Sequence, residues 1–148
     1  PRDFTEEARA HWQGRWVLMV EDEPVLRKAT ARLLKRELGV MVVPAKDGRE
    51  ALNLVDQHDF DLVLTDYFMP KLDGIGLIQS LRADEQDLPI IGITAATIGQ
   101  EADDLKRGGA DVVLPKPLTI DALAQAICTL EQQGRLGPTA TSKLTSAG

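Results

Sequence analysis

The stretch LVLTD, residues 62–66, decides the fold of this chain. It is a short apolar run that ends in the carboxylate of Asp66, and the residues after it, up to Gly74, include Pro70 and have the character of a loop. An apolar run of this length is typical of a strand that is buried on both faces. Open α/β sheets bind their ligands at the C-terminal ends of such strands. Asp66 is therefore the first candidate functional residue.

Further apolar runs have the same character, and segments with helical periodicity separate them. The runs cover residues 17–20, 41–43, 90–93 and 112–114. The helical segments are expected from residue 24, from residue 48, around residues 77–81, over 98–107 and over 120–130. Strand and helix alternate, which predicts an α/β fold with a doubly wound, five-stranded parallel sheet and helices on both faces. Right-handed crossovers favour a flavodoxin-like strand order, 2-1-3-4-5.

Local signals mark where some of these helices begin or end. Pro24 suits the first turn of the first helix. Asp47 and Glu50 have the spacing of a capping box, with Asp47 as the N-cap and Glu50 reaching back. The fourth helix is expected to stop at Gly108-Gly109. Cys128 is the only cysteine and is expected to be a small core residue, so the chain has neither an internal disulfide nor a cysteine-based metal cluster.

The two ends of the chain differ from its central part. Residues 1–15 form a leader for which two arrangements stay open. Either Phe4, Trp12 and Trp16 fix a short helix to the domain, or Trp16 alone packs at the start of the first strand. Residues 16–131 hold the α/β domain, and residues 132–148 have few apolar anchors and are expected to be disordered. Pro1 in place of Met suggests a processed product or a piece of a longer protein.

Composition excludes several classes of function. The 148 residues have room for one domain with a real core. The formal net charge of −6 and the scattered basic residues argue against a nucleic-acid-binding surface. No apolar run approaches the roughly 20 residues that span a bilayer, and the sequence contains no signal peptide. We therefore expect a soluble protein of a reducing, cytoplasmic setting that makes no direct membrane contact.

Chemically useful side chains follow four of the expected strands. They are Glu21 and Asp22, Asp66, Thr94 and Lys116. Because parallel strands end at the same edge of the sheet, we expect these side chains to lie together. Neighbouring carboxylates repel one another and favour a hard divalent cation, most plausibly Mg²⁺. Lys116 and Thr94 could hold phosphoryl oxygens, and Asp66 could act as a nucleophile that forms an aspartyl phosphate.

Over about residues 16–131 the chain resembles the receiver domain of two-component response regulators. The matches, in chain order, are the acidic pair Glu21-Asp22, the phosphoacceptor Asp66, the switch hydroxyl of Thr94 and the pair Lys116-Pro117. The stretch MPKLDG, residues 69–74, also fits the family pattern. Residues 88–95 and 114–118 are most similar to receivers attached to hybrid sensor histidine kinases, which makes such a kinase the expected parent protein.

The resemblance implies a reaction and roles for the residues. Asp66 would take a phosphoryl group from a phosphohistidine on a histidine kinase or a histidine phosphotransfer domain, and the domain would then switch its interaction surface. The donor would not be ATP, and the sequence has no Gly-rich phosphate loop. Asp22, Asp66 and the backbone carbonyl of Phe68 would ligate Mg²⁺, with Glu21 acting through water. The receiver would catalyse its own phosphorylation and dephosphorylation. The Lys116–Pro117 peptide would be cis.

Three positions depart from the family pattern. Val113 stands where family members usually carry Tyr or Phe as part of the switch, and it has no ring to swing inward when Thr94 moves. Phe68, two residues after Asp66, stands where many members carry a polar residue; we expect its bulk to hinder the hydrolytic water and lengthen the phosphoryl lifetime. Ala96, two residues after Thr94, offers no group to orient water.

The same residues also bear on two alternatives to a phosphorylated receiver. A pseudo-receiver would keep the fold as a protein-interaction module without phosphorylation. Val113 is compatible with that function, whereas the intact Asp66 and Lys116 argue against it. A phosphatase of the haloacid-dehalogenase type needs a second acid where Phe68 stands, so we set it aside. No output module follows the domain, so we expect a single-domain regulator or, favoured by Pro1 and the flanking tails, the receiver of a hybrid kinase.

Overall fold

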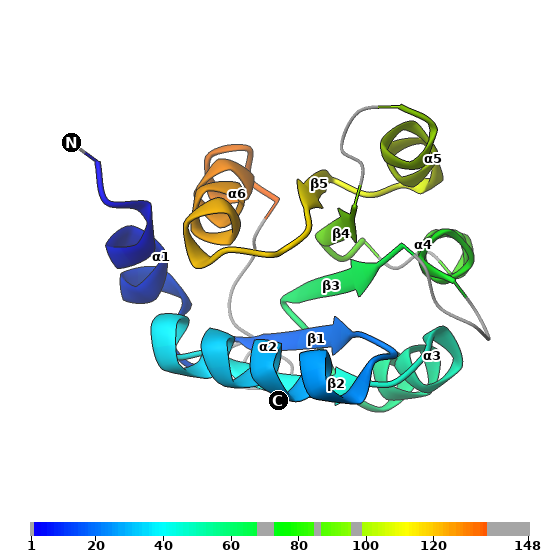
Figure 1. Cartoon of the computed structure of the whole chain (residues 1–148), viewed down its shortest axis with the longest axis horizontal. Helices are drawn as coiled ribbons and strands as arrows, with labels where there is room; N and C mark the ends of the chain where they lie inside the picture. The colour runs from blue at the N-terminus through cyan, green and yellow to red at the C-terminus, as the bar shows by residue number, and fades with distance from the viewer. Residues whose placement is uncertain (1, 68–72, 85–86, 96–98, 136–148) are drawn as a thin grey trace.

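A five-stranded parallel sheet forms the centre of the molecule, as Figure 1 shows for this computed structural model. The structure describes residues 2–67, 73–84, 87–95 and 99–135. The strands are β1 Trp16–Val20, β2 Met41–Ala45, β3 Leu62–Asp66, β4 Ile90–Thr94 and β5 Val112–Pro115. Their order is β2-β1-β3-β4-β5 and every pairing is parallel. The predicted sheet and its strand order are confirmed.

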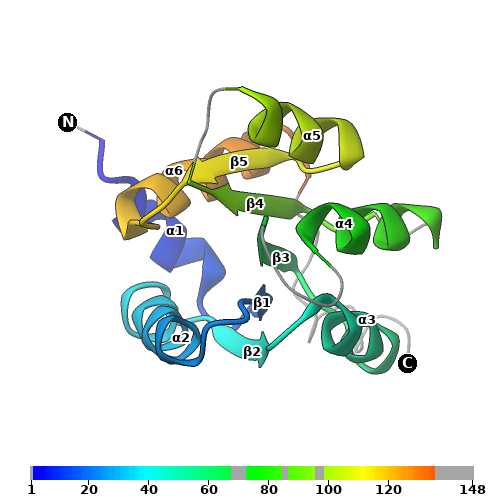
Figure 2. The same cartoon turned by 45° about the vertical axis from the view of Figure 1, so that its right-hand side comes forward.

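Helices cover both faces of the sheet (Figures 1 and 2). They are α1 Phe4–Trp12, α2 Pro24–Leu38, α3 Gly48–Gln57, α4 Gly74–Ala83, α5 Gln100–Gly108 and α6 Ile120–Gln132. One hydrophobic core lies between the sheet and α1, α2 and α6. A second core lies between the sheet and α3, α4 and α5. This two-layer burial explains why the strand residues are apolar on both faces.

Burial is complete only in the middle of the sheet. All five residues of β3 are buried, which agrees with the sequence. The outermost strands differ from the expectation that every strand is buried on both faces, because β5 is half-buried and Met41 of β2 is exposed. An edge strand has only one neighbour, so the covering helices shield it incompletely. The catalytic candidates on β1 and β3 therefore occupy the most enclosed part of the sheet edge.

The helix boundaries follow the local signals of the sequence. Pro24 begins α2, and the Glu23 carboxylate caps this helix by accepting from the amides of Val25 and Leu26. Asp47 caps α3 as predicted and accepts from the Glu50 amide at 2.9 Å. The Glu50 carboxylate reaches back and accepts from the amide of Lys46 at 3.4 Å. α5 ends at Gly108 with Gly109 as its C-cap, as predicted.

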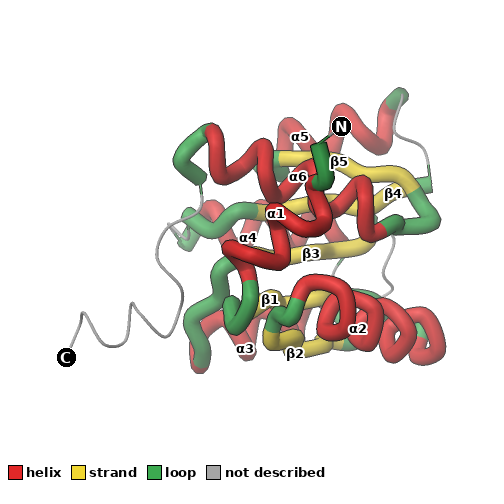
Figure 3. The backbone as a smooth tube through the Cα atoms, turned by 90° about the vertical axis from the view of Figure 1, so that its left-hand side faces the viewer, coloured by secondary structure: helices red, strands yellow, loops and turns green. Residues whose placement is uncertain are grey.

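The leader folds as a helix that Phe4 and Trp12 fix to the domain, as in the first of its two predicted arrangements, whereas Trp16 packs against the second core. α1 lies against α6 and α2 (Figure 3), and the side chains of Ala8 and Trp12 are fully buried there. The indole Nε1 of Trp12 donates to a carboxylate oxygen of Glu131 on α6 at 3.1 Å. Trp16 occupies the first position of β1. Cys128 on α6 is buried beneath α1, in agreement with its predicted core position.

The C-terminal part of the described chain is tied to the loops at the opposite edge of the sheet from Asp66. After α6, the Arg135 guanidinium bonds the carboxylates of Asp111 and Asp87, both at 2.9 Å. Most of the segment for which we expect disorder, residues 136–148, lies outside the described residues. None of the helices in the described part of the chain combines the length and the apolarity that crossing a bilayer requires.

Candidate functional site

The register of the central strands brings Glu21 next to Asp66. Asp66 is the last residue of β3, and Glu21 directly follows β1. β1 pairs with β3 so that Val20 lies opposite Thr65, and the next residues along both strands are therefore Glu21 and Asp66. The Glu21 amide also donates to the Ala45 carbonyl at the end of β2, at 3.0 Å. The site is thus built on the paired ends of β1, β2 and β3.

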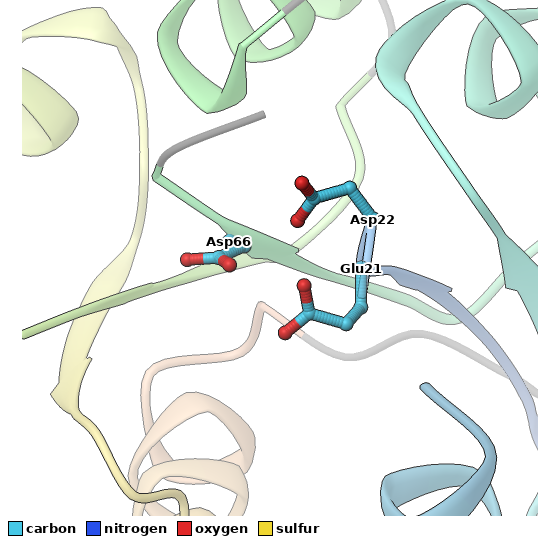
Figure 4. A group of neighbouring side chains, drawn as sticks. All are labelled: Glu21, Asp22 and Asp66. Atoms are coloured by element: carbon cyan, nitrogen blue, oxygen red, sulfur yellow. The ribbon is translucent and has the colours of Figure 1, made fainter. Parts of the chain in front are cut away.

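Three carboxylates gather at this edge, as Figure 4 shows. One oxygen from each of Glu21, Asp22 and Asp66 lies within 4.8 Å of the other two. Glu21 is 8% exposed and Asp66 is 5% exposed, so most of their surface is shielded from water. Carboxylate oxygens are the ligands that Mg²⁺ prefers, and one or two of them usually hold this ion in phosphate-handling sites. The three carboxylates that the sequence predicts at this edge therefore lie together, and their oxygens suit a divalent cation.

The crowding of these carboxylates changes their electrostatics. The pKa of Glu21 is raised to about 7, chiefly by burial, with further contributions from the hydrogen bond to Asp22 and the charge of Asp66. Like charges that are close together and shielded from solvent disfavour ionisation. A cation between these groups would remove that penalty. Without a cation, the repulsion between these carboxylates is therefore only partly compensated by the rest of the chain.

Lys116 supplies the positive charge that the sequence predicts. Its Nζ lies 2.7 Å from Oδ2 of Asp66 and forms an ion pair with that carboxylate. Burial by itself would lower the pKa of Lys116, but the hydrogen bond and charge of Asp66, with the charges of the neighbouring acids, raise it above its ordinary value. Lys116 follows β5, and the peptide that joins it to Pro117 is cis, as expected. Lys116 is thus held as a cation beside the candidate nucleophile.

Thr94 lies at the end of β4 and is almost fully buried. Its carbonyl oxygen accepts from the Lys116 amide at 2.9 Å, so the backbone joins the two residues that the sequence assigns to phosphoryl oxygens. Its hydroxyl donates to the carboxylate of Glu101 in the first turn of α5. Glu101 did not emerge from the sequence, because no motif distinguishes it from the other acids of that polar helix.

The remaining predicted site residues lie apart or outside the described part of the chain. Val113 lies in β5 opposite Gly92, is half-buried, and packs against the core beneath α4 and α5. Phe68, whose carbonyl is the expected fourth metal ligand, and Ala96 lie outside the described residues. Their roles, like the switch role of Val113, stay predictions.

A cavity of about 340 Å³ opens beside Asp66 and Lys116. Its walls are mainly apolar and include Leu26 of α2, Ile93 of β4 and Leu118. Leu26, which lines the cavity, and its chain neighbour Val25 are large apolar side chains that are 43% and 75% exposed. An apolar surface therefore lies directly beside the candidate nucleophile.

Comparisons with known proteins agree with this site. The model of the response regulator receiver domain family matches residues 17–128. Sensor histidine kinase RcsC of Salmonella typhi is 36% identical over 119 residues, which are 80% of this chain and 12% of that protein. Sensor protein EvgS of Escherichia coli K12 is 36% identical over 125 residues, which are 82% of this chain and 10% of that protein. The chain thus spans only about a tenth of the length of these relatives.

Solved structures show the same fold. The receiver domain of sensor histidine kinase PA1611 from Pseudomonas aeruginosa PAO1, which has a magnesium ion coordinated in its active-site cleft, superposes with a TM-score of 0.70 at 28% identity and covers 78% of this chain and 96% of that one. Response regulator TrrA from Thermotoga maritima, solved in complex with Mg(2+)-BeF, gives a TM-score of 0.69 at 29% identity over 78% of this chain and 98% of that one. From its sequence match, its sheet and its site, this chain belongs to the receiver domain family of two-component response regulators.

Proposed function

We propose that Asp66 is the phosphoacceptor of this receiver and takes a phosphoryl group from a phosphohistidine on a histidine kinase or a histidine phosphotransfer domain. The observation that carries the proposal is the pairing of Asp66 with Lys116 at 2.7 Å inside a cluster of three carboxylates. In the reaction a carboxylate oxygen of Asp66 attacks phosphorus, the bond from phosphorus to the histidine nitrogen breaks, and the imidazole leaves. The Lys116 ammonium would then partner a phosphoryl oxygen in place of the carboxylate.

Mg²⁺ is the cofactor that we assign to the acidic cluster. Asp22 and Asp66 would ligate the ion, Glu21 would act through water, and the Phe68 carbonyl would complete the protein ligands. Bound there, the ion would offset the repulsion between the carboxylates and the incoming phosphoryl group. Without it, the only cationic side chain bonded to Asp66 among the described residues is Lys116.

Phosphorylation would act as a switch. It adds about one to two negative charges at Asp66. Lys116 and Thr94, which the backbone already joins, would close on the phosphoryl oxygens, and the neighbouring surface of α5, β5 and α6 would change with them. A local charge would thereby bias a two-state element and alter which partners bind.

The exposed apolar residues at the start of α2 support a protein as the donor. Leu26 lines the cavity beside Asp66 and the exposed Val25 precedes it in the chain, and a protein surface that carries a phosphohistidine could cover both. A small-molecule donor gains nothing from this patch. The similarity to RcsC and EvgS further supports a parent protein that is a larger sensor kinase with this domain on its cytoplasmic side.

The first experiment measures the intact mass after incubation with Mg²⁺ and acetyl phosphate. We expect one phosphoryl adduct on the wild type, and none on Asp66→Asn or in the presence of EDTA. If no adduct forms with acetyl phosphate or with a phosphorylated histidine-containing partner, the proposal fails and the pseudo-receiver is the better assignment.

A second experiment tests the protein donor. Val25→Asp should slow transfer from a phosphohistidine protein at least tenfold and leave the acetyl phosphate reaction within about twofold, because a charge in a docking patch disfavours the complex. Met41→Asp makes the same chemical change at the opposite end of the sheet, where Met41 is 46% exposed, and should affect neither reaction. Equal slowing of both reactions by Val25→Asp would contradict docking at α2.

A further inference from the structure

The hydroxyl of Thr94 is already engaged away from the phosphoryl site. It donates to a carboxylate oxygen of Glu101, which lies in the first turn of α5. A threonine hydroxyl has one proton to donate. While that proton is shared with Glu101, it is not available to an oxygen of a phosphoryl group on Asp66. The two acceptors therefore compete for the same donor.

Glu101 is a strong competitor because of its charge. An ionised carboxylate is an acceptor only, and hydrogen bonds to a charged group are about twice as strong as those between neutral groups. Glu101 is half-buried and Thr94 is almost fully buried, so water competes poorly for this bond. Breaking this bond therefore costs free energy in any state in which the Thr94 hydroxyl turns to the phosphoryl group.

The packing of α5 holds Glu101 at this distance. Leu105, one turn further along α5, is fully buried against β4, and a side chain at Gly92 would meet its Cδ1 at 3.1 Å. Ala102 is buried on the same side of the helix. Because α5 and β4 touch this closely, the backbone of Glu101 is held near the end of β4, and only its side-chain torsions can adjust unless the helix shifts.

The charge of Glu101 also acts on Tyr67, the residue that follows Asp66. The pKa of the Tyr67 hydroxyl is raised, first by burial and then by the negative charges of Asp104, Glu101 and Asp73. Tyr67 extends β3 directly beyond Asp66, and its amide bonds the Ile93 carbonyl of β4 at 3.0 Å. The backbone thus joins Tyr67 to the strand that ends at Thr94.

We propose that Glu101 is a positioning residue that holds the Thr94 hydroxyl in the unphosphorylated receiver and must release it when Asp66 is phosphorylated. The inference rests on the proposed function of Asp66 and adds the group that opposes the switch. Removing this acceptor makes the phosphorylated arrangement easier to reach. Affinity for a phosphoryl analogue should rise, while affinity for Mg²⁺ alone should not, because Glu101 is not a member of the acidic cluster.

The test measures binding of beryllofluoride, a phosphoryl analogue, to the Mg²⁺-loaded protein by ¹⁹F NMR. We expect Glu101→Ala to raise the affinity about three- to tenfold, the range set by the net strength of one hydrogen bond. Asp103→Ala is the matched control, since it removes one carboxylate from the same turn of α5 and its side chain is exposed. The control should stay within about twofold of wild type, and Mg²⁺ affinity should stay within about twofold for both variants.

A double mutant separates the hydrogen bond from a general charge effect. In a Thr94→Val background, Glu101→Ala should no longer raise beryllofluoride affinity, because the hydroxyl for which Glu101 competes is gone. Glu101→Gln keeps the volume of the side chain and leaves a neutral acceptor, so it should give a smaller rise and serves if the alanine variant does not fold.

Three outcomes overturn the inference. One is an unchanged affinity in both Glu101 variants, another is an equal rise in Asp103→Ala, and the third is a rise that persists without the Thr94 hydroxyl. If the wild type binds beryllofluoride normally, such a result removes Glu101 alone from the switch. If the wild type binds no beryllofluoride and forms no acetyl phosphate adduct, the proposed function of Asp66 fails, and this inference fails with it.

Discussion

Replacing Gly74 by Ala tests whether the junction of β3 and α4 holds Asp66 in place. Gly74 is the first residue of α4, and its amide donates to the Tyr67 carbonyl at 3.1 Å. A Cβ added there would overlap the Asp66 carbonyl oxygen and would lie 3.1 Å from the Tyr67 Cα. Both atoms belong to the backbone and cannot rotate away. The end of β3 or the start of α4 must therefore move.

The expected cost follows from this overlap. Overpacking a well-packed interior costs about 1–3 kcal/mol, and the better helix propensity of Ala returns about 0.5–1 kcal/mol. We expect the free energy of unfolding to fall by about 1–2 kcal/mol, measured by urea denaturation. A shift of about 1 Å in a reacting group can cost about a hundredfold in rate. The rate of acetyl phosphate adduct formation should therefore fall about ten- to hundredfold.

Gly108→Ala is the control for this variant. A Cβ at Gly108 would meet no atom closer than the Cγ2 of Ile75 at 3.8 Å, which is an ordinary contact. The same substitution should there be neutral or stabilise by up to about 1 kcal/mol. Wild-type stability together with a wild-type phosphorylation rate in Gly74→Ala would refute the idea that this glycine positions the phosphoacceptor.

Further predictions concern α1, Cys128 and Phe68. Trp12→Ala should lower the free energy of unfolding by about 3–5 kcal/mol, because it empties a fully buried site and removes a hydrogen bond to Glu131. The side chain of His11 is 63% exposed, so the control His11→Ala should lower the free energy of unfolding by less than about 0.5 kcal/mol. Burial raises the pKa of the Cys128 thiol, which leaves less thiolate at neutral pH. Alkylation by iodoacetamide at pH 7 should therefore be slow in the wild type and faster in Trp12→Ala. Equal rates would contradict docking of α1 over this thiol. Phe68→Asn should accelerate dephosphorylation, measured as loss of the phosphoryl adduct over time, and an unchanged rate would remove the proposed shielding of the hydrolytic water.

The sheet and the acidic cluster were predictable because one rule places them. In a parallel sheet every strand ends at the same edge, so carboxylates that follow β1 and β3 must meet there. The apolar runs predicted where the strands lie, and right-handed crossovers favoured the observed strand order. The Asp66–Lys116 contact needed only the knowledge that Asp66 ends one strand and Lys116 follows another, although β4 lies between β3 and β5.

Other features depend on side-chain packing that no local pattern encodes. The partner of Thr94 is set by the rotation of α5, which the contact of Leu105 with Gly92 determines. The docking of α1 depends on Trp12 meeting Glu131, 119 residues away in the sequence. The exposure of Met41 follows from the edge position of β2, which the apolar run alone does not reveal.

The packing of α1 on α6 joins the two ends of the described chain. The hydroxyl of Thr5 bonds the Asp121 carboxylate at a sequence separation of 116 residues. Trp12 and Glu131, which are also in contact, are 119 residues apart in the sequence. Contacts between such distant segments form only after the loop between them has closed, so they slow folding and come late in it. In the folded protein neither end can open alone without exposing the same buried side chains. The amides of α1 and α6 should therefore exchange with solvent through one shared opening, with a single free energy.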